Sequence, residues 1–139
     1  MRSFGLCDLF RRPPSFLLGW VITTYPDGRP HVMPIWGIWV NGAFYFSTDR
    51  QSRKAHNLAR NPHCIVCNER ANEAVIVHGQ AEEVRDPELI HELSKPYYRK
   101  YKPWKLDPAM GAIFVIHPSL ALAMYEKKFD TSATRWQFS

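Results

Sequence analysis

The fold is indicated most directly by the stretch Phe44-Tyr45-Phe46-Ser47-Thr48-Asp49-Arg50-Gln51-Ser52-Arg53-Lys54-Ala55-His56-Asn57-Leu58, in which a strand-forming run passes at once into a helix-forming one. The aromatic residues that open it favour an extended strand. Ser52 is a good N-cap, and Ala55 and Leu58 fall on one face of the helix that follows. Asn61-Pro62 then ends that helix. The stretch therefore predicts a strand followed by a short helix that packs by one apolar stripe.

The same stretch gathers groups that bind an anion. The first turn of a helix presents unpaired backbone N–H groups and the positive end of the helix dipole. Ser47 and Thr48 add hydroxyls, and Arg53 and Lys54 add positive charge. Cations oppose the dipole at this end of a helix, so their placement is unfavourable without an anion. We predict a phosphate site here, with Ser52 acting first of all as the cap.

Three strands are expected up to this helix, at residues 19–25, 30–39 and 43–48. Pro34 cannot donate to a strand ladder and Gly37 favours a bulge, so the second strand bends or lies at a sheet edge. Asn41-Gly42 favours a tight hairpin between the second and third strands. The three strands therefore form an antiparallel meander.

The rest of the chain continues with strands and one more helix. Strands are expected at residues 63–68, 74–84, 111–117 and 121–125, with a bulge or bend at Gly79 and a connection through Pro118-Ser119. Asp86 and Pro87 open the second helix as its cap and first residue. Pro96 is expected to kink or divide it. Six or seven short antiparallel strands with two or three short helices predict a mainly β fold, a small closed or split β-barrel.

Length and composition limit the class of protein. A chain of 139 residues supports one hydrophobic core, so we expect a single domain over residues 1–139, with a poorly defined N-terminal segment at residues 1–18. No apolar run is long enough to span a membrane, and Arg11-Arg12-Pro13-Pro14 interrupts any signal-peptide core, so a cytoplasmic location is expected. The net charge of +5 favours an anionic partner. The basic clusters lack the regular aromatic spacing of a nucleic-acid groove, which disfavours nucleic acid as that partner.

Cys64 and Cys67 have the two-residue gap that metal and redox sites use. They stand within a predicted buried strand and no second ligand pair accompanies them. We therefore interpret them as core residues and predict no metal site.

Other residues allow two interpretations each. Trp36 and Trp136 are either core residues or stack beside a cofactor ring. The segment Tyr97-Tyr98-Arg99-Lys100-Tyr101 reads first as a surface helix whose lysines reach the solvent, and second as a cover for the ligand pocket. His31, His78 and His117 lie in strands, and no pair of nucleophile and base is evident, so the catalytic residues stay unassigned.

Several motifs together resemble the pyridoxamine 5′-phosphate oxidase-like family. They are residues 28–36 (Gly-Arg-Pro-His-Val-Met-Pro-Ile-Trp), the strand 44–48, the segment 52–58, Asn61-Pro62 and the strand 75–82. The tail 133–138 resembles the ending of the flavin- and deazaflavin-using reductase branch of that family.

This resemblance implies a split β-barrel of the FMN-binding type, a homodimer with the cofactor at the subunit interface. The implied cofactor is FMN, or alternatively the 5-deazaflavin coenzyme. By matching position, Arg53 and Lys54 would hold its phosphate. The other implied cofactor-binding residues are Met33, Pro34, Ile35 and Trp36 along the ring, the hydroxyl residues Ser47, Thr48 and Ser52, and Trp136.

The expected activity is hydride transfer to or from a small organic substrate, because in such enzymes the ring carries the hydride and the protein binds and orients. Oxidation of pyridoxamine phosphate itself is not expected, since the cations that would grip a second phosphate are missing. Two alternatives stay open: a protein that binds a flavin, a deazaflavin or haem without turnover, and a small basic barrel that binds single-stranded nucleic acid.

Overall fold

The computed structural model describes residues 19–138, so the predicted N-terminal segment 1–18 lies outside the described residues. Within residues 19–138 no helix is both long enough and apolar enough to cross a membrane. The elements are β1 (Gly19–Thr24), β2 (Pro30–Ile35), β3 (Gly37–Val40), β4 (Ala43–Thr48), α2 (Arg53–Arg60), β5 (His63–Asn68), β6 (Glu73–Glu83), α3 (Pro87–Tyr101), β7 (Ala112–Tyr125), the 3₁₀ helix η1 (Glu126–Lys128), α4 (Phe129–Ser132) and β8 (Thr134–Gln137).

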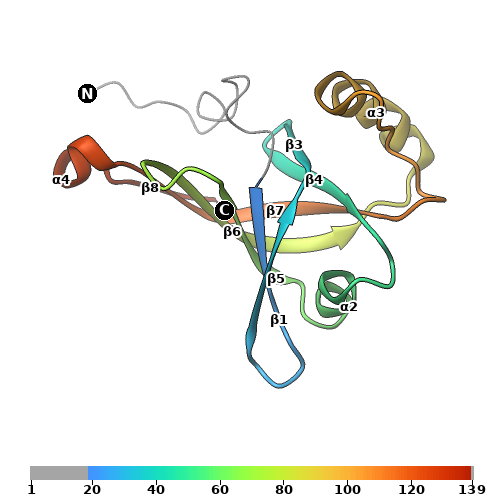
Figure 1. Cartoon of the computed structure of the whole chain (residues 1–139), viewed down its shortest axis with the longest axis horizontal. Helices are drawn as coiled ribbons and strands as arrows, with labels where there is room; N and C mark the ends of the chain where they lie inside the picture. Colours follow the sequence, from blue (N-terminus) through green and yellow to red (C-terminus); the bar gives the residue numbers. More distant parts are fainter. Residues whose placement is uncertain (1–18, 139) are drawn as a thin grey trace.

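The strands form one antiparallel sheet that curls into a half-barrel, as the sequence predicts for a split barrel (Figure 1). Its order is β2-β1-β5-β6-β7-β4-β3, and β8 also pairs with β7. The long strand β7 pairs with β4 through residues 112–116 and with β8 through residues 120–123. In Figure 1, α2 and α3 lie toward one end of the sheet, and α4 and β8 toward the other.

The two main helices pack on opposite faces of the β4–β7 pair. Ala55 and Leu58 of α2 join a core cluster with Phe46, Phe114 and Ile116. Residues of α3 join a second cluster with Ile113 and Val115, which alternate with Phe114 and Ile116 along β7. Successive side chains of a strand alternate between its faces, so burial on both faces explains the uninterrupted apolar run at the start of β7.

The other half of the sheet has one buried face and one half-exposed apolar face. On β1, Val21 and Thr23 are buried, whereas Trp20 is 42% exposed and Ile22 is partly exposed. The strand registers extend the exposed side across five strands. We call this surface the outer face; it comprises Trp20, Ile22, Val32, Ile65, Ile76 and Leu122.

Several local predictions are confirmed. Asn41 and Gly42 adopt φ values of 50° and 78°, as a tight hairpin requires. The register between β6 and β7 shifts at Gly79, where an added Cβ would lie 2.4 Å from the carbonyl oxygen of His117. Asp86 caps α3 with Pro87 as its first residue, and β2, which contains Pro34, lies at an edge of the sheet.

Two predicted strand boundaries are wrong. The expected strand at residues 30–39 divides at Trp36 into β2 and β3, next to Gly37, whose missing side chain leaves room for the Phe44 ring. The two strands expected at residues 111–125 are one strand, because Pro118 stands opposite Gly79 at the bulge, where a missing N–H is tolerated.

The helix α3 continues through Pro96 instead of dividing there. The side chains of Leu93, Tyr97 and Tyr101, before and after the proline, are buried in one core cluster. Packing of a continuous apolar face stabilises a helix more than local propensity does. Tertiary contacts therefore outweigh the hydrogen bond that Pro96 removes.

Candidate functional site

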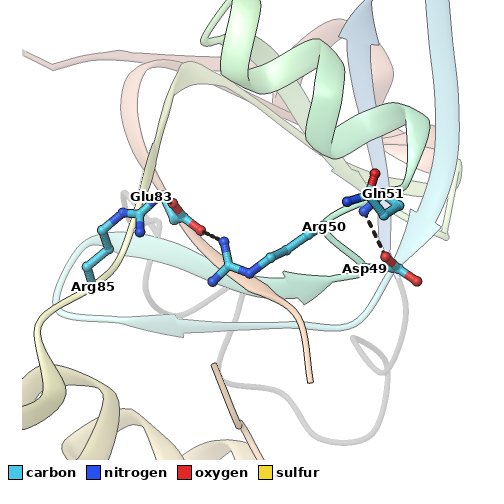
Figure 2. A network of polar contacts seen from close by, with 5 residues as sticks. All are labelled: Asp49, Arg50, Gln51, Glu83 and Arg85. Atoms are coloured by element: carbon cyan, nitrogen blue, oxygen red, sulfur yellow. Dashed lines mark hydrogen bonds and ion pairs between the residues drawn. The ribbon is translucent and has the colours of Figure 1, made fainter. Parts of the chain in front are cut away.

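The predicted strand-to-helix junction is built as expected. Figure 2 shows the loop between β4 and α2, in which the Asp49 carboxylate accepts from the backbone N–H of Gln51 at 2.7 Å. Ser52 caps α2: its Oγ accepts from the backbone N–H of Ala55 at 3.2 Å. The Thr48 hydroxyl lies 3.2 Å from that same Oγ. We call the group formed by Ser47, Thr48 and residues 52–54 the corner.

The corner carries positive charge with no acidic residue in the first turn of α2, residues 53–56. Burial lowers the pKa of Lys54, and the charge of Asp49 offsets part of that shift. A half-buried ammonium at a helix N-terminus is doubly unfavourable, since both desolvation and the dipole oppose its charge. A bound phosphate would relieve both effects, so the donors at the corner fit a phosphate group.

Tyr25, the residue that follows β1, makes a cation–π contact with Arg53. The Arg53 guanidinium lies 5.5 Å from the centroid of the Tyr25 ring, and that of Arg29 lies 4.6 Å from it. Arg29 is held in turn by Asp27 at 2.7 Å. Sequence reasoning missed Tyr25, because its contact with Arg53 depends on how the β1–β2 turn folds back toward α2.

The helix α2 is fixed to the sheet by a buried polar contact. The Asn57 side-chain amide donates to the Thr23 hydroxyl at 3.0 Å, and both residues are 1% exposed. A buried hydrogen bond of this kind costs stability if either partner is lost. It therefore fixes the orientation of α2, and with it the corner, relative to β1.

The residues predicted to line the cofactor ring lie along edge strand β2 and the break after it. Met33 is 40% exposed and Trp36 39% exposed, whereas Ile35 is buried at 4%. Ile35 therefore offers a ligand only its backbone, and Pro34 has no N–H to donate. The Trp36 ring stacks on Tyr101 with centroids 5.1 Å apart and an interplanar angle of 4°.

The end of α3 braces this strand break. The Lys100 ammonium and the Tyr101 hydroxyl both donate to the carbonyl oxygen of Gly37, at 2.8 and 2.6 Å. Burial lowers the pKa of Lys100 to about 8. The interpretation of residues 97–101 as a solvent-facing surface helix is therefore wrong for Lys100, and also for Tyr97 and Tyr101, which are buried at 6% and 7% exposure.

Trp136 lies on β8, where it pairs with Ala121 and packs against the buried Val75 and Val77. In Figure 1, β8 and α2 are well separated. Within one chain, the structure does not bring Trp136 to the corner.

The two strand cysteines lie on opposite faces of β5. Cys64 is buried in the core, where its thiol lies 3.8 Å from the carbonyl oxygen of Gly79, whereas Cys67 pairs with Trp20 across the sheet on the outer side. Three residues apart on a strand, their side chains point in opposite directions. They do not converge on one ion, and among residues 19–138 no three His, Cys, Asp or Glu side chains gather as metal ligands.

A curled antiparallel half-barrel with a cationic strand-to-helix corner defines a split-barrel protein. A family model described as "Pyridoxamine 5′-phosphate oxidase" matches residues 10–125, and the chain belongs to this family. Among curated proteins no sequence matches the chain.

Solved structures share the fold. General stress protein 26 from Bacillus anthracis superimposes with a TM-score of 0.71 at 19% identity, over 96% of this chain and 95% of that one. An F420 reductase gives 0.67 at 24% identity, over 86% and 98% of the two chains. A haem-binding protein from Mycobacterium smegmatis gives 0.70 at 15% identity, over 88% and 53%. At these identities the likeness extends to the fold alone.

Proposed function

We propose that this protein is an oxidoreductase that binds FMN, or alternatively the 5-deazaflavin coenzyme, and passes a hydride to or from a small organic substrate. The corner supports this proposal most strongly. Its hydroxyls, its capped helix N-terminus and its two cations form a phosphate cradle, and α2 offers no acidic partner in its first turn. Both coenzymes present a phosphate, so the corner alone does not choose between them.

The chain's own residues would divide the work of binding. Arg53 offers a planar fork of donors and is oriented by the Tyr25 ring, whereas Lys54 acts as a half-buried point charge. Ser47 and Thr48, at the end of β4, would add hydroxyl hydrogen bonds to the same phosphate. When bound, the ring supplies the hydride chemistry, and the protein supplies orientation and exclusion of water.

Residues at the β2–β3 break would hold the ring. Met33 and Trp36 offer exposed apolar surface, and Trp36 is kept in one orientation by its stack on Tyr101. The carbonyl of Gly37, the residue that follows, is fixed by Lys100 and Tyr101. A rigid wall of this kind lowers the entropy cost of binding a planar ring.

We further propose that the working form is a homodimer. The outer face is apolar and half exposed, and it lies on a curled sheet that no second sheet of residues 19–138 closes. Covering such a surface favours association. A second copy is also the simplest way to bring Trp136 near a corner from which it is separated in its own chain.

The cofactor proposal is tested by titrating the purified, cofactor-stripped protein with FMN and, separately, with the 5-deazaflavin coenzyme, following ring fluorescence. Binding of one in the micromolar range or tighter is expected. The double variant R53A/K54A should lose this binding. The double variant R70A/K95A removes the same charge at exposed positions away from the corner and should keep it.

The outcomes separate the three functions. Cofactor binding that the R53A/K54A variant retains would refute the phosphate assignment. Tight cofactor binding without reduction by a hydride donor would instead support a binding protein. Binding of neither coenzyme would refute the redox proposal; titrations with haem and with a labelled oligonucleotide at several salt concentrations would then decide between the alternatives.

The dimer is tested by light scattering after gel filtration. Trp20→Glu places a charge on the outer face and should convert a dimer to a monomer that keeps its far-UV spectrum. Met110→Glu changes an apolar side chain that is 82% exposed on the loop after α3 and should leave the dimer intact. A wild-type protein that is monomeric at tens of micromolar would refute this part of the proposal.

A further inference from the structure

A cavity lies beside the corner, between the first half of α3 and the ends of β4 and β6. It has a volume of about 440 Å³, within the usual size range of small-molecule sites. Its lining combines apolar, polar and cationic side chains: Arg50, Val84, Arg85, Pro87, Ile90, His91, Ser94 and Pro108. Nothing in the proposed cofactor site uses this cavity.

Two arginines of this cavity are held in place by one carboxylate. Figure 2 shows Arg50 reaching from the β4–α2 loop to Glu83 at the end of β6, with Arg85 on the other side of the same carboxylate. Each arginine pairs with a different oxygen of Glu83. Arg53, three residues after Arg50, instead contacts Tyr25, the residue that follows β1. The corner and this cavity therefore have different cations.

Arg50, Arg85 and Glu83 together carry one positive charge that no carboxylate in this cluster balances. Two guanidinium groups face one carboxylate, for a net charge of about +1. A guanidinium has five N–H donors, and the contacts to Glu83 use one nitrogen of each. The side chain of Arg85 is 76% exposed, so its remaining donors are accessible to a ligand. A bidentate acceptor such as a carboxylate matches this fork.

Apolar side chains form a large part of the remaining cavity wall, together with His91 and Ser94. Val84 and Ile90 are buried at 7% and 8% exposure, and Pro87 adds further hydrocarbon surface. A small inorganic ion would gain no binding free energy from these apolar side chains. A ligand with an apolar body would gain it by removing their hydrocarbon surface from water. The single excess charge also favours a monoanion over a dianionic phosphate.

We propose that this cavity is a second ligand site, which binds a small organic carboxylate with an apolar body. The carboxylate pairs with Arg85 and Arg50, and the body lies against Val84 and Ile90 of the wall. Glu83 preorganises the two arginines and at the same time competes with the ligand for their charge.

The probe is benzoate, and the matched control is benzamide, which has the same shape without the charge. Each is titrated into isotopically labelled protein at constant ionic strength, followed by NMR chemical shifts. Benzoate should give saturable shifts centred on residues 84–94, with benzamide and inorganic phosphate each binding at least about tenfold more weakly. Benzoate shifts that do not saturate, or that benzamide reproduces, would overturn the proposal.

Three variants make the test specific. Arg85→Gln should weaken benzoate binding by about tenfold, because a charge-assisted hydrogen bond is lost. Arg70→Gln removes an equally charged, partly exposed side chain on the β5–β6 turn and should change nothing. Glu83→Gln keeps the size of the side chain and removes the competing charge, so benzoate should bind more tightly. Equal weakening by Arg85→Gln and Arg70→Gln would reveal a general charge effect and overturn the proposal.

Discussion

Lys100 donates through its ammonium to the backbone carbonyl oxygen of Gly37, 63 residues earlier in the chain, at 2.8 Å. The contact ties the last turn of α3 to the break between β2 and β3, where Trp36 is exposed. Lys100 is partly buried, and this burial lowers its pKa from 10.5 to about 8, with a smaller opposing effect from Glu69. The geometry of the proposed ring wall is therefore linked to the charge of one lysine.

Stability should rise between about pH 8 and pH 10 because of Lys100. Below pH 8 the amine is protonated in both the folded and the unfolded chain. Above the folded pKa of about 8, the unfolded chain still binds the proton that the folded chain has released, so the free energy of unfolding increases with pH. Lys100→Met should remove this rise, as measured by urea unfolding at a series of pH values.

Lys95→Met is the control for that series, since it removes an exposed lysine from the same helix. It should keep the pH dependence of the wild type. If the Lys100→Met protein showed the same rise as the wild type, Lys100 would not titrate with a lowered pKa.

The Tyr101 hydroxyl and the Lys100 ammonium donate to the same carbonyl oxygen, that of Gly37. The contribution of the Tyr101 hydroxyl to the free energy of unfolding can therefore be measured on its own. Tyr101→Phe removes the 2.6 Å hydrogen bond and keeps the ring that stacks on Trp36. Lys100 still donates to the carbonyl, so the loss should be that of one ordinary hydrogen bond, about 1 kcal/mol in the free energy of unfolding. Tyr98→Phe, at a tyrosine that is 38% exposed, should cost much less in the same urea experiment.

Local sequence signals predicted the helix caps and the hairpin turn well. Ser52, the Asn41-Gly42 turn and Asp86-Pro87 each act through hydrogen bonds and backbone angles of their immediate neighbours, so their structure follows from the residues around them.

Contacts between distant segments were beyond the same reasoning. The braces from α3 to Gly37 and the pairing of Arg50 with Glu83 join residues 33 to 64 positions apart. Strand β8 was missed because Thr134–Gln137 is short and is stabilised by its register with β7, not by its own composition. Pro118 was misread as a break between two strands, because the bulge at Gly79 tolerates its missing N–H. Pro96 was expected to kink or divide α3, and the division does not occur because packing offsets its cost.

Cys64 should be unreactive in the folded protein. Burial raises the pKa of its thiol to about 12, and also raises that of Cys67. At pH 8 a thiol with that pKa is about one part in ten thousand thiolate, which is the reactive form. In a Cys7→Ser background, mass spectrometry after iodoacetamide treatment should find Cys64 unmodified until urea unfolds the chain.

The variants Cys64→Ser and Cys67→Ser in that background assign each alkylation event to one thiol. Modification of Cys64 at the rate of a free peptide thiol, in a protein that is still folded, would contradict its burial under the β6 bulge.

Ser52 combines two roles that two substitutions can separate. Its Oγ caps α2 and lies beside the Thr48 hydroxyl. Ser52→Ala loses the cap and should lower the free energy of unfolding by about 1 kcal/mol. Ser52→Asp keeps a capping oxygen and adds a negative charge that the helix dipole favours, so stability should equal or exceed that of the wild type.

The order of the two variants should be reversed for cofactor affinity: the more stable Ser52→Asp protein should bind FMN more weakly than Ser52→Ala. A carboxylate at position 52 repels a phosphate at the corner, so Ser52→Asp should weaken FMN binding by at least about tenfold, whereas Ser52→Ala should weaken it less. Urea unfolding and fluorescence titration on the same preparations measure both effects. If Ser52→Asp bound FMN as tightly as the wild type, the phosphate would not lie at the start of α2, and Arg53 and Lys54 would need another ligand.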